Sequence, residues 1–314
     1  MEHKRVMVLG AAGKMGKHLV PKLVQSGNEV DVLARFSNRE IQTEFEKLGC
    51  GIYQADLSAE DALRNVPNDY DYVYNMAGIK FGAGTDPQYT VEVQVMAVAR
   101  IMEHFADCGG IMYASSGNIY PDTVDGCSEK DAPQPPSFYG MTRVGAEWMT
   151  EYFCRRNSTP AMVQRIFYAY HEEFGVPTDI ARQIRDGEAV DITTEFVNCI
   201  WLDDILDLMM AAAEHCDIPC VYLNMTGLEK VSVVEIATRL GEYMGKEPRF
   251  KGTPKGTSLL GKSEKMAELL WAPPTSLDEG LRRVAESVMK SEFPLDHPTE
   301  WEKRDKFGEQ HENG

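Results

Sequence analysis

The stretch GAAGKMG, residues 10–16, decides which fold the rest of the sequence predicts. It follows the apolar run RVMVL at residues 5–9 and leads into a segment whose apolar residues recur at helical spacing. Three glycines at i, i+3 and i+6 between a strand and a helix suit a turn that approaches a pyrophosphate closely, while the helix N-terminus offers free N–H groups. The turn is therefore predicted to bind a dinucleotide. The residues expected to contact it are Gly10, Gly13, Lys14, Met15 and Gly16.

Strand-like and helix-like segments alternate through the first half of the chain. Short apolar runs are separated by longer segments with helical spacing. This alternation predicts an α/β fold of the Rossmann type, in which a doubly wound parallel sheet carries helices on both faces. The expected strands are residues 5–9, 29–34, 51–54, 72–75, 110–115 and 161–167. The expected helices are residues 14–25, 87–106 and 138–156.

The pattern changes in the second half, where short helical and extended pieces follow one another. These pieces predict a smaller C-terminal α/β lobe that lies on the nucleotide domain and is not an independent domain. The last residues are polar and charged, which favours a loosely ordered tail. The expected division is a dinucleotide-binding Rossmann domain at residues 1–168, a substrate-binding lobe interleaved with it at 169–293, and a polar tail at 294–314.

The composition argues against several classes of partner. With 32 basic and 49 acidic residues the net charge is −17, whereas a phosphate-binding surface needs positive potential, so we expect no nucleic-acid and no membrane partner. No apolar run reaches the ~18–20 residues of a membrane span. Seven scattered cysteines without a CxxC pair favour reduced thiols in a cytoplasmic enzyme. The seven histidines show no ligand spacing, so no metal site is expected.

The residue that follows the second expected strand bears on the choice of cofactor. An acid at the tip of that strand binds the ribose 2′-OH of NAD in Rossmann domains. Here the tip carries Arg35, and Asp31 lies inside the strand, where it is expected to face elsewhere. A guanidinium can pair with a 2′-phosphate, so we expect NADP. The alternative is that Arg35 stacks on adenine or faces water, which leaves NAD as the cofactor. Asp56 and Leu57, just past the third strand, suit a contact to the adenine ring.

A second group of residues suits proton transfer. Ser116 follows an apolar strand, at the edge where parallel sheets present their ligands. Tyr139 and Arg143 are spaced i, i+4 and share one face of a helix. A fixed cation stabilises a phenolate, so Tyr139 can move a proton while Ser116 holds the substrate oxygen and a nicotinamide takes or gives a hydride. Taken singly, Ser116 is better explained as a cap at the end of a strand, and Tyr139 with Arg143 as a pair on the surface of a helix. Their order behind the glycine turn favours catalysis.

These motifs together resemble the extended short-chain dehydrogenase/reductase family, in particular its NAD(P)-dependent epimerase/dehydratase members of the UDP-galactose 4-epimerase kind. The resemblance runs over almost the whole chain. It rests on five segments: MAGIK at 76–80, ASSGNIYP at 114–121, SEKDAPQPPSFYGMTRVGAE at 128–147, FVNCIWLDDI at 196–205 and VSVVEIATRLGEYMGKEP at 231–248.

The resemblance implies roles for individual residues. It implies that Ser116 and Tyr139 are catalytic, and that Arg143 takes the place of the family's lysine, binding the nicotinamide ribose and holding a positive charge beside the tyrosine. It also implies a homodimer built by pairing the helices expected at residues 87–106 and 138–156. The further cofactor contacts that it implies are Ala77, Gly78, Lys80 and Gln94.

Three positions depart from the family pattern. The guanidinium of Arg143 is larger than the ammonium of lysine and is forked. The substitution indicates either catalysis with an altered geometry or a specialised or inactive member of the family. Tyr168 stands where many members carry an asparagine. Glu195 stands where nucleotide-sugar enzymes usually place an arginine toward the diphosphate, so a smaller sugar-like or carbonyl compound competes with a nucleotide sugar as substrate. Gly117 and Asn118 follow Ser116 in place of an acidic pair, which argues against dehydration.

The sequence therefore predicts an NAD(P)-dependent epimerase or oxidoreductase that acts on a hydroxyl or carbonyl carbon of a sugar-like small molecule. Asn118, Tyr168 and His171 are expected to contact the substrate, although a solvent-exposed loop is the simpler description of His171. One alternative is an NADP-dependent reductase or dehydrogenase of a small non-nucleotide carbonyl compound. The other is a catalytically impaired NAD(P)-binding regulatory protein.

Overall fold

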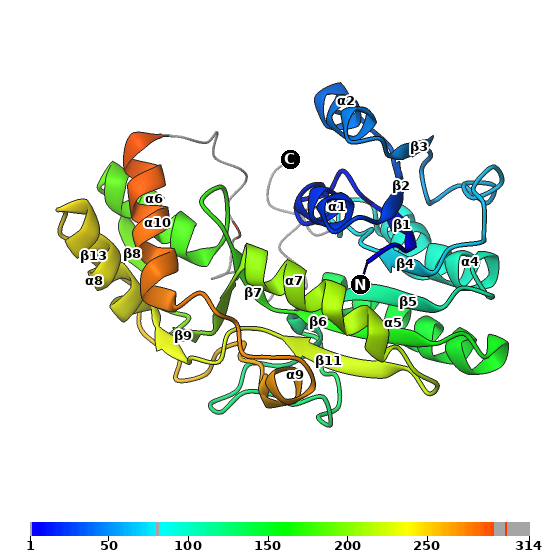
Figure 1. Cartoon of the computed structure of the whole chain (residues 1–314). Helices are drawn as coiled ribbons and strands as arrows, with labels where there is room; N and C mark the ends of the chain where they lie inside the picture. The colour runs from blue at the N-terminus through cyan, green and yellow to red at the C-terminus, as the bar shows by residue number, and fades with distance from the viewer. Residues whose placement is uncertain (1, 80–81, 292–298, 300–314) are drawn as a thin grey trace.

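A seven-stranded parallel sheet organises the first two thirds of the chain (Figure 1). The computed structural model describes residues 2–79, 82–291 and 299. The strand order is β11-β6-β5-β4-β1-β2-β3, so the order reverses between β1 and β4, and every neighbouring pair is parallel. This is the expected Rossmann-type sheet. The strands are β1 Arg5–Leu9, β2 Glu29–Ala34, β3 Gly51–Gln54, β4 Tyr72–Asn75, β5 Gly110–Ser116, β6 Ala161–Ile166 and β11 Val221–Met225.

Both faces of the sheet are covered by helices, which explains why its central strands are apolar throughout. On one face, Leu19 of α1 and Leu208 of α7 join the same core as the strand residues. On the other face, Ile101 of α4 and Phe153 of α5 join a second core. The helices concerned are α1 Gly16–Gln25, α2 Arg39–Lys47, α4 Ala97–His104, α5 Phe138–Asn157 and α7 Leu202–Ala212.

Two of the expected helices differ from the structure in informative ways. The helix expected from residue 14 begins at Gly16, because the turn still bends the backbone around Gly13, whose N–H donates to Gly10 O at 3.0 Å. The helix expected at residues 87–106 is divided into three pieces. These are α3 Pro87–Val91, a π-helical turn η1 Glu92–Met96, and α4. The wider π turn places Gln94 in a buried position, and apolar periodicity alone does not reveal such an insertion.

The second half of the chain forms short strand pairs and a three-helix group, which lies at the left of Figure 1. Helices α6, α8 and α10 pack on one another around a separate apolar core. The chain returns to the large sheet through β11, which pairs with β6. The helices are α6 Val176–Asp186, α8 Val233–Met244, α9 Glu264–Leu269 and α10 Leu277–Lys290. The short strand pairs are β7 Tyr168–Tyr170 with β10 Cys199–Trp201, β8 Ala189–Asp191 with β13 Arg249–Lys251, and β9 Phe196–Val197 with β12 Val231–Ser232.

Two expectations of domain organisation stay predictions. The division of the chain at residues 168 and 293 is not tested by the sheet order. The polar tail expected at 294–314 lies, apart from Thr299, outside the described residues. Among the helices that the structure describes, none combines the length and the apolar character that crossing a membrane requires.

A buried ion pair joins α5 to the sheet behind the site. Arg165 Nη2 lies 2.8 Å from Glu147 Oε2, and both side chains are almost fully buried. Ser115 Oγ donates to Glu147 Oε1 at 2.5 Å, and Arg165 Nη1 donates to the Tyr120 hydroxyl at 2.5 Å. The pair therefore satisfies its own charges inside the protein, and removing one partner would leave the other unpaired.

We expect Glu147→Ala to destabilise the protein by about 3–5 kcal/mol, because it strands the Arg165 guanidinium in the interior. The free energy of unfolding from urea denaturation measures the loss. Glu235→Ala, which removes the partner of Arg239 in an exposed pair on α8, is the matched control and is expected to change stability little. Equal losses of unfolding free energy in the two variants would contradict the importance of the Glu147–Arg165 pair for stability.

Candidate active site

The glycine turn between β1 and α1 lies directly against the loop that follows β4. Gly10 has a φ of +74°, and a Cβ added there would lie 2.7 Å from the backbone N and Cα of Ala77. A Cβ on Gly16 would lie 2.5 Å from Ala11 O. Among the described residues no side chain caps the first turn of α1, because the N-cap residue is Met15. The turn thus combines close backbone approach with a helix N-terminus that no described side chain caps, which suits a pyrophosphate. The N–H groups of Lys17 and His18 donate to Gly13 O and Met15 O of the turn itself.

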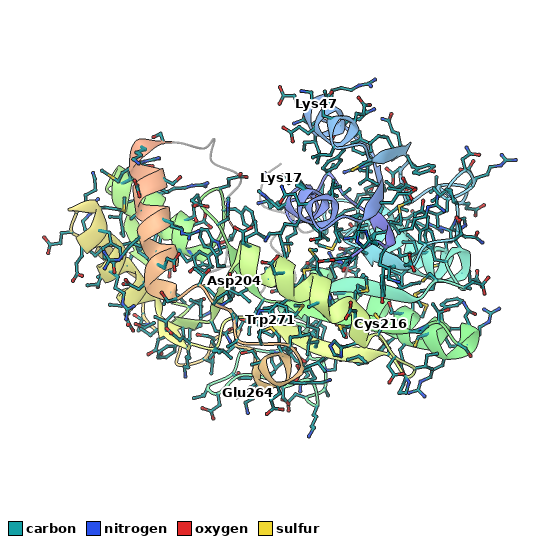
Figure 2. All side chains as sticks on the ribbon, viewed as in Figure 1. Lys17, Lys47, Asp204, Cys216, Glu264 and Trp271 are labelled. Carbon is teal, nitrogen blue, oxygen red and sulfur yellow. The ribbon has the colours of Figure 1, made fainter. Side chains whose placement is uncertain are left out.

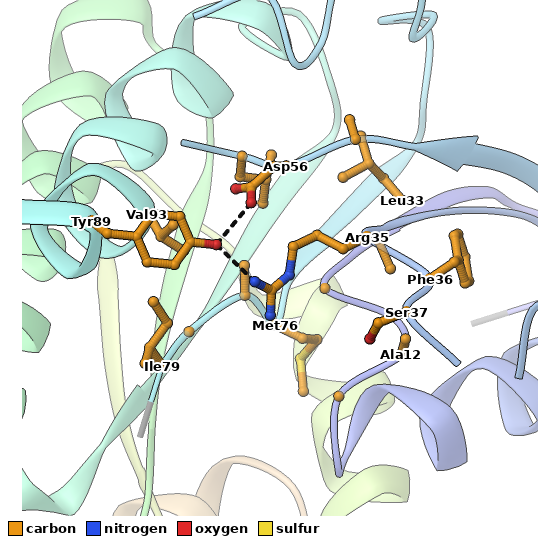
Figure 3. A pocket seen from close by; sticks show the side chains of 17 residues that line it. Ala12, Leu33, Arg35, Phe36, Ser37, Asp56, Met76, Ile79, Tyr89 and Val93 are labelled. Atoms are coloured by element: carbon orange, nitrogen blue, oxygen red, sulfur yellow. Dashed lines mark hydrogen bonds between the residues drawn. The ribbon is translucent and has the colours of Figure 1, made fainter. Parts of the chain in front are cut away.

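A pocket lies beside this turn, at the place where the adenosine end of a dinucleotide is expected, and is called the adenosine pocket below (Figure 3). It is lined by the glycine turn and by residues at the ends of β2, β3 and β4. The expected cofactor residues Gly10, Gly13, Arg35, Asp56, Leu57, Ala77 and Gly78 all line it. The expected residue Lys80 lies outside the described residues.

A chain of hydrogen bonds crosses this pocket. Arg35 Nη1 donates to the Tyr89 hydroxyl at 2.8 Å, and that hydroxyl donates to Asp56 Oδ2 at 2.8 Å (Figure 3). Burial alone would raise the pKa of Asp56, but hydrogen bonds from Ser58 and Tyr89 and the charge of Arg35 lower it. Asp31 takes no part, because it is buried and accepts from the Tyr70 hydroxyl at 2.6 Å. Asp31 therefore faces elsewhere, as expected from its place inside the strand.

The strand-end serine is also the cap of a short helix. Ser116 Oγ accepts from the backbone N–H and from the side-chain Nδ2 of Asn118, both at 3.2 Å, at the start of the 3₁₀ turn Gly117–Ile119. The capping explanation and the catalytic one are therefore compatible. Because both contacts donate to the oxygen, the hydroxyl proton of Ser116 is the part that can reach a substrate oxygen.

Arg143 is buried beside Tyr139. Its guanidinium carbon lies 5.1 Å from the centre of the Tyr139 ring, with 6% of the residue exposed. Burial opposes the charge, but the oxygens of Tyr113 and Tyr139 outweigh it, and the pKa of Arg143 lies above its ordinary value. The expected cation beside the tyrosine is therefore present, and it is an interior group rather than half of a surface pair.

The terminal nitrogen Nη1 of Arg143 has three acceptors. It donates to the Tyr113 hydroxyl at 2.9 Å, to Ala114 O at 3.1 Å and to Ala77 O at 3.3 Å. The Nε–H of Arg143 is buried and has no hydrogen-bond acceptor in the part of the chain that the structure describes. A bound ligand that offers an oxygen there would satisfy this donor, which fits the hydroxyl-rich ribose of a dinucleotide.

Gln94 joins three parts of the site from the π turn. Its Nε2 donates to Thr142 Oγ1 at 2.6 Å, and its Oε1 accepts from Ile79 N at 3.0 Å. These contacts link the π turn, α5 and the loop after β4. Gln94 therefore supports the walls of the site from within the core, where 1% of it is exposed.

The residues expected to contact substrate lie in two places. Asn118 is next to Ser116, as described above. Tyr168 begins β7 and packs among apolar residues of the second half. His171 follows β7, and its ring lies 5.2 Å from that of His18 and 5.3 Å from that of Trp201. The description of His171 as a solvent-exposed loop residue is wrong, because its side chain is 16% exposed and packs between α1 and β10.

A polar cluster that the sequence did not indicate joins the loop after β7 to α1. His18, His171 and Glu173 offer ligand atoms within 4.8 Å of one another. His18, whose Nε2 lies 3.8 Å from Glu173 Oε2, and the hydrogen-bonded ammonium of Lys17 oppose desolvation and lower the pKa of Glu173 to about 2. Lys17, labelled in Figure 2, places its Nζ 2.5 Å from Glu173 Oε2, so the carboxylate already has a cation. Since the N-terminal end of α1 is also positive, we do not assign a metal to this cluster.

Two residues of the site were missed in the sequence. Tyr89 carries the hydrogen-bond chain across the adenosine pocket, and Tyr113 is an acceptor for Arg143. Neither belongs to a motif, and each meets its partner across a long sequence separation. Only the folded arrangement of α3, β2 and β5 reveals them.

Comparisons with known proteins identify a family and a fold to which this chain is similar. A family model described as the NAD dependent epimerase/dehydratase family matches residues 6–222. GDP-mannose 3,5-epimerase 1 of Oryza sativa subsp. indica is 23% identical over 314 residues, which cover 90% of this chain and 80% of that protein. L-arabinose 1-dehydrogenase (NAD(P)(+)) of Haloferax volcanii is 24% identical over 215 residues, which cover 63% of this chain and 77% of that protein.

The fold has close counterparts among solved structures. UDP-glucuronic acid 4-epimerase from Bacillus cereus in complex with NAD superposes with a TM-score of 0.78 at 22% identity, covering 91% of this chain and 96% of that one. The family model spans most of the sheet, the glycine turn and the Tyr139 helix. The resemblance stated from the sequence motifs is thereby confirmed. The chain belongs to the NAD-dependent epimerase/dehydratase family of enzymes, within the extended short-chain dehydrogenases/reductases.

Proposed function

We propose that this protein is an NAD(P)-dependent epimerase or oxidoreductase that acts on a hydroxyl or carbonyl carbon of a sugar-like substrate. The observation that carries the proposal is the buried Arg143 guanidinium beside Tyr139, one helix turn from the start of α5 and hydrogen-bonded to Ala114 O near the end of β5. No carboxylate among the described residues pairs with Arg143, and a buried cation without such a partner is costly unless it serves a bound group or a reaction. Tyr139, Ser116 and Arg143 are the residues to which we assign the chemistry.

The roles follow from the contacts of each residue. The bound nicotinamide supplies the hydride acceptor or donor. Tyr139 exchanges the proton of the reacting hydroxyl, since the Arg143 charge beside its ring favours the phenolate. Ser116 donates its hydroxyl proton to the same substrate oxygen, because Asn118 already occupies its acceptor side. We assign Asn118, Tyr168 and His171 to the surroundings of the substrate.

The substrate class has two candidates. The relatives named for GDP-mannose and UDP-glucuronic acid support a nucleotide sugar. Glu195, which stands where a cation would meet a diphosphate, and the relative named L-arabinose 1-dehydrogenase support a smaller free sugar or carbonyl compound. The seven free thiols suit a reducing compartment, and we propose a cytoplasmic enzyme.

We expect Tyr139→Phe to lower turnover by about 10²–10⁴-fold, because it removes the group that moves the proton. The assay screens UDP- and GDP-sugars for epimerisation and free aldoses for reduction of NAD(P)⁺. Tyr152→Phe, an exposed tyrosine of the same helix, is the control and should retain activity. If Tyr139→Phe turned over substrate at the wild-type rate, the assignment of proton transfer to Tyr139 would be refuted. If the wild-type protein turned over none of these compounds, the catalytically impaired regulatory protein would be the better description.

For the cofactor we propose NADP, with NAD as the alternative. The tip of β2 carries Arg35 and no acid, and the guanidinium is held at the edge of the adenosine pocket by Tyr89. A charge-assisted contact to a 2′-phosphate has no counterpart in NAD. The Bacillus cereus structure, which is named as a complex with NAD, supports the alternative.

If Arg35 binds the 2′-phosphate, Arg35→Ala should weaken NADPH binding by about 10–100-fold, the range of a lost hydrogen bond to a charged group, with a much smaller effect on NADH. Fluorescence titration with each reduced cofactor gives the two dissociation constants. Arg39→Ala, in the next helix, is the matched control. Equal weakening for both cofactors would favour NAD.

We also propose a homodimer formed through the helical segment at residues 87–106, which comprises α3, η1 and α4, and through α5. Four large apolar side chains are exposed here: Met96 (47%), Met141 (50%), Trp148 (63%) and Tyr152 (56%). The three on α5 follow helical spacing and lie along one face. Exposed apolar groups gathered on one face are typical of a subunit interface.

We expect Trp148→Ser to convert the dimer into a monomer at micromolar concentration, because the change removes the largest apolar group of this face. Light scattering coupled to gel filtration measures the mass. Trp271→Ser, which alters an exposed tryptophan after α9 (Figure 2), should leave the mass unchanged. A monomeric wild-type protein would refute the proposal outright.

A further inference from the structure

The arginine at position 143 is surrounded by a group of residues that suits its shape. We define this Arg143 cluster as Ala77, Gly78, Tyr113 and Ala114. Two backbone carbonyls and the Tyr113 hydroxyl accept from Nη1, at 3.3, 3.1 and 2.9 Å. All three acceptors therefore hold the same end of the guanidinium.

The other end of the guanidinium lies over Gly78. A Cβ added to Gly78 would lie 1.9 Å from Nη2, 2.7 Å from Cζ and 3.0 Å from Nη1 of Arg143, and the three nearest atoms all belong to this side chain. The space that an alanine would need at position 78 is therefore filled by the arginine head. Lysine has a single terminal nitrogen and no planar fork, so it cannot fill both ends of this cluster at once.

We propose that Tyr113 is a positioning residue that allows an arginine to serve in the position where the family carries lysine. Its hydroxyl anchors Nη1, which keeps the guanidinium beside Tyr139 and leaves Nε–H available for a bound cofactor. The inference rests on the proposed function, because it assumes that Arg143 contributes to cofactor binding. It assigns to Tyr113 a role that no sequence motif carries.

The chemistry of the pair supports an anchoring role. Burial raises the pKa of Tyr113 to about 12, against the opposing influence of Arg143, so the phenol is neutral at physiological pH. A neutral phenol oxygen accepts from the guanidinium without cancelling its charge. The positive charge of Arg143 is therefore held in place and remains available to Tyr139 and to the cofactor.

The first test is a double-mutant cycle on NADH affinity, measured by fluorescence titration of full-length Tyr113→Phe, Arg143→Lys and the double variant. We expect Tyr113→Phe to weaken NADH binding by about 5–10-fold in the wild-type background and by less than about twofold in the Arg143→Lys background, because contacting residues couple non-additively. Thermal melts check folding. Tyr74→Phe, a buried tyrosine whose hydroxyl lies 3.5 Å from Met209 O, is the control and should leave affinity unchanged.

The second test approaches the cluster from its other side and serves if Tyr113→Phe folds poorly. We expect Gly78→Ala to weaken NADH binding strongly in the wild-type background, since its Cβ collides with the arginine head. The loss should be several-fold smaller in the Arg143→Lys background. A role of Gly78 that concerned only the loop backbone would produce the same loss in both backgrounds.

The outcomes separate the inference from the function on which it rests. Equal losses for Tyr113→Phe in both backgrounds overturn the positioning role of Tyr113. Equal losses for Gly78→Ala in both backgrounds overturn the premise that the Arg143 head fills the space over Gly78. If Arg143→Ala loses NADH affinity and Tyr113→Phe keeps it, the positioning role of Tyr113 is overturned. The proposed function is left intact by that result. If Arg143→Ala binds NADH as tightly as the wild-type protein, both the positioning role of Tyr113 and the assignment of Arg143 are overturned.

Discussion

The close approach of the β1–α1 turn to the loop after β4 is the constraint on which the site depends. Gly10 and Ala77 are so near that a single methyl group on the glycine would collide with backbone. The contact occurs where the strand order of the sheet reverses, between β1 and β4. At such a point the loops from neighbouring strands diverge and leave a crevice for a ligand. The same loop that meets Gly10 also supplies a carbonyl to Arg143, so the glycine turn and the helix that carries Tyr139 both contact this loop.

Two buried arginines near the site differ in the partners of their charges. The Arg143 guanidinium donates to a phenol and two backbone carbonyls, whereas the charge of the nearby Arg165 is neutralised by Glu147. The two buried arginines therefore do different things. Arg165 ties α5 to β6 and stabilises the fold, while Arg143 retains a net positive charge that a bound cofactor and the Tyr139 phenolate can use.

At the adenosine pocket, as at Arg143, a tyrosine hydroxyl orients an arginine, in a hydrogen-bond chain that runs from Arg35 through Tyr89 to Asp56. It joins the tip of β2, the segment after β3 and the start of α3 across the adenosine pocket. The single hydroxyl proton of Tyr89 goes to Asp56, so its oxygen is left to accept from Arg35. Arg35 is thereby oriented over the pocket but shares its charge with a carboxylate, and a 2′-phosphate must compete with that arrangement.

The parallel sheet, the glycine turn and the family could all be predicted from the residues alone, because these features depend on local patterns. Buried strands must be apolar, and a phosphate turn needs glycine at fixed spacing, so both can be recognised from residues that are close together in the sequence. The order Ser116, Tyr139, Arg143 likewise needed no coordinates. The tertiary structure alone decided that the helix expected at 87–106 contains a π turn, that His171 packs against His18, and that Tyr89 and Tyr113 complete the site. Each of these features joins residues far apart in the chain, and periodicity carries no information about which distant side chains meet.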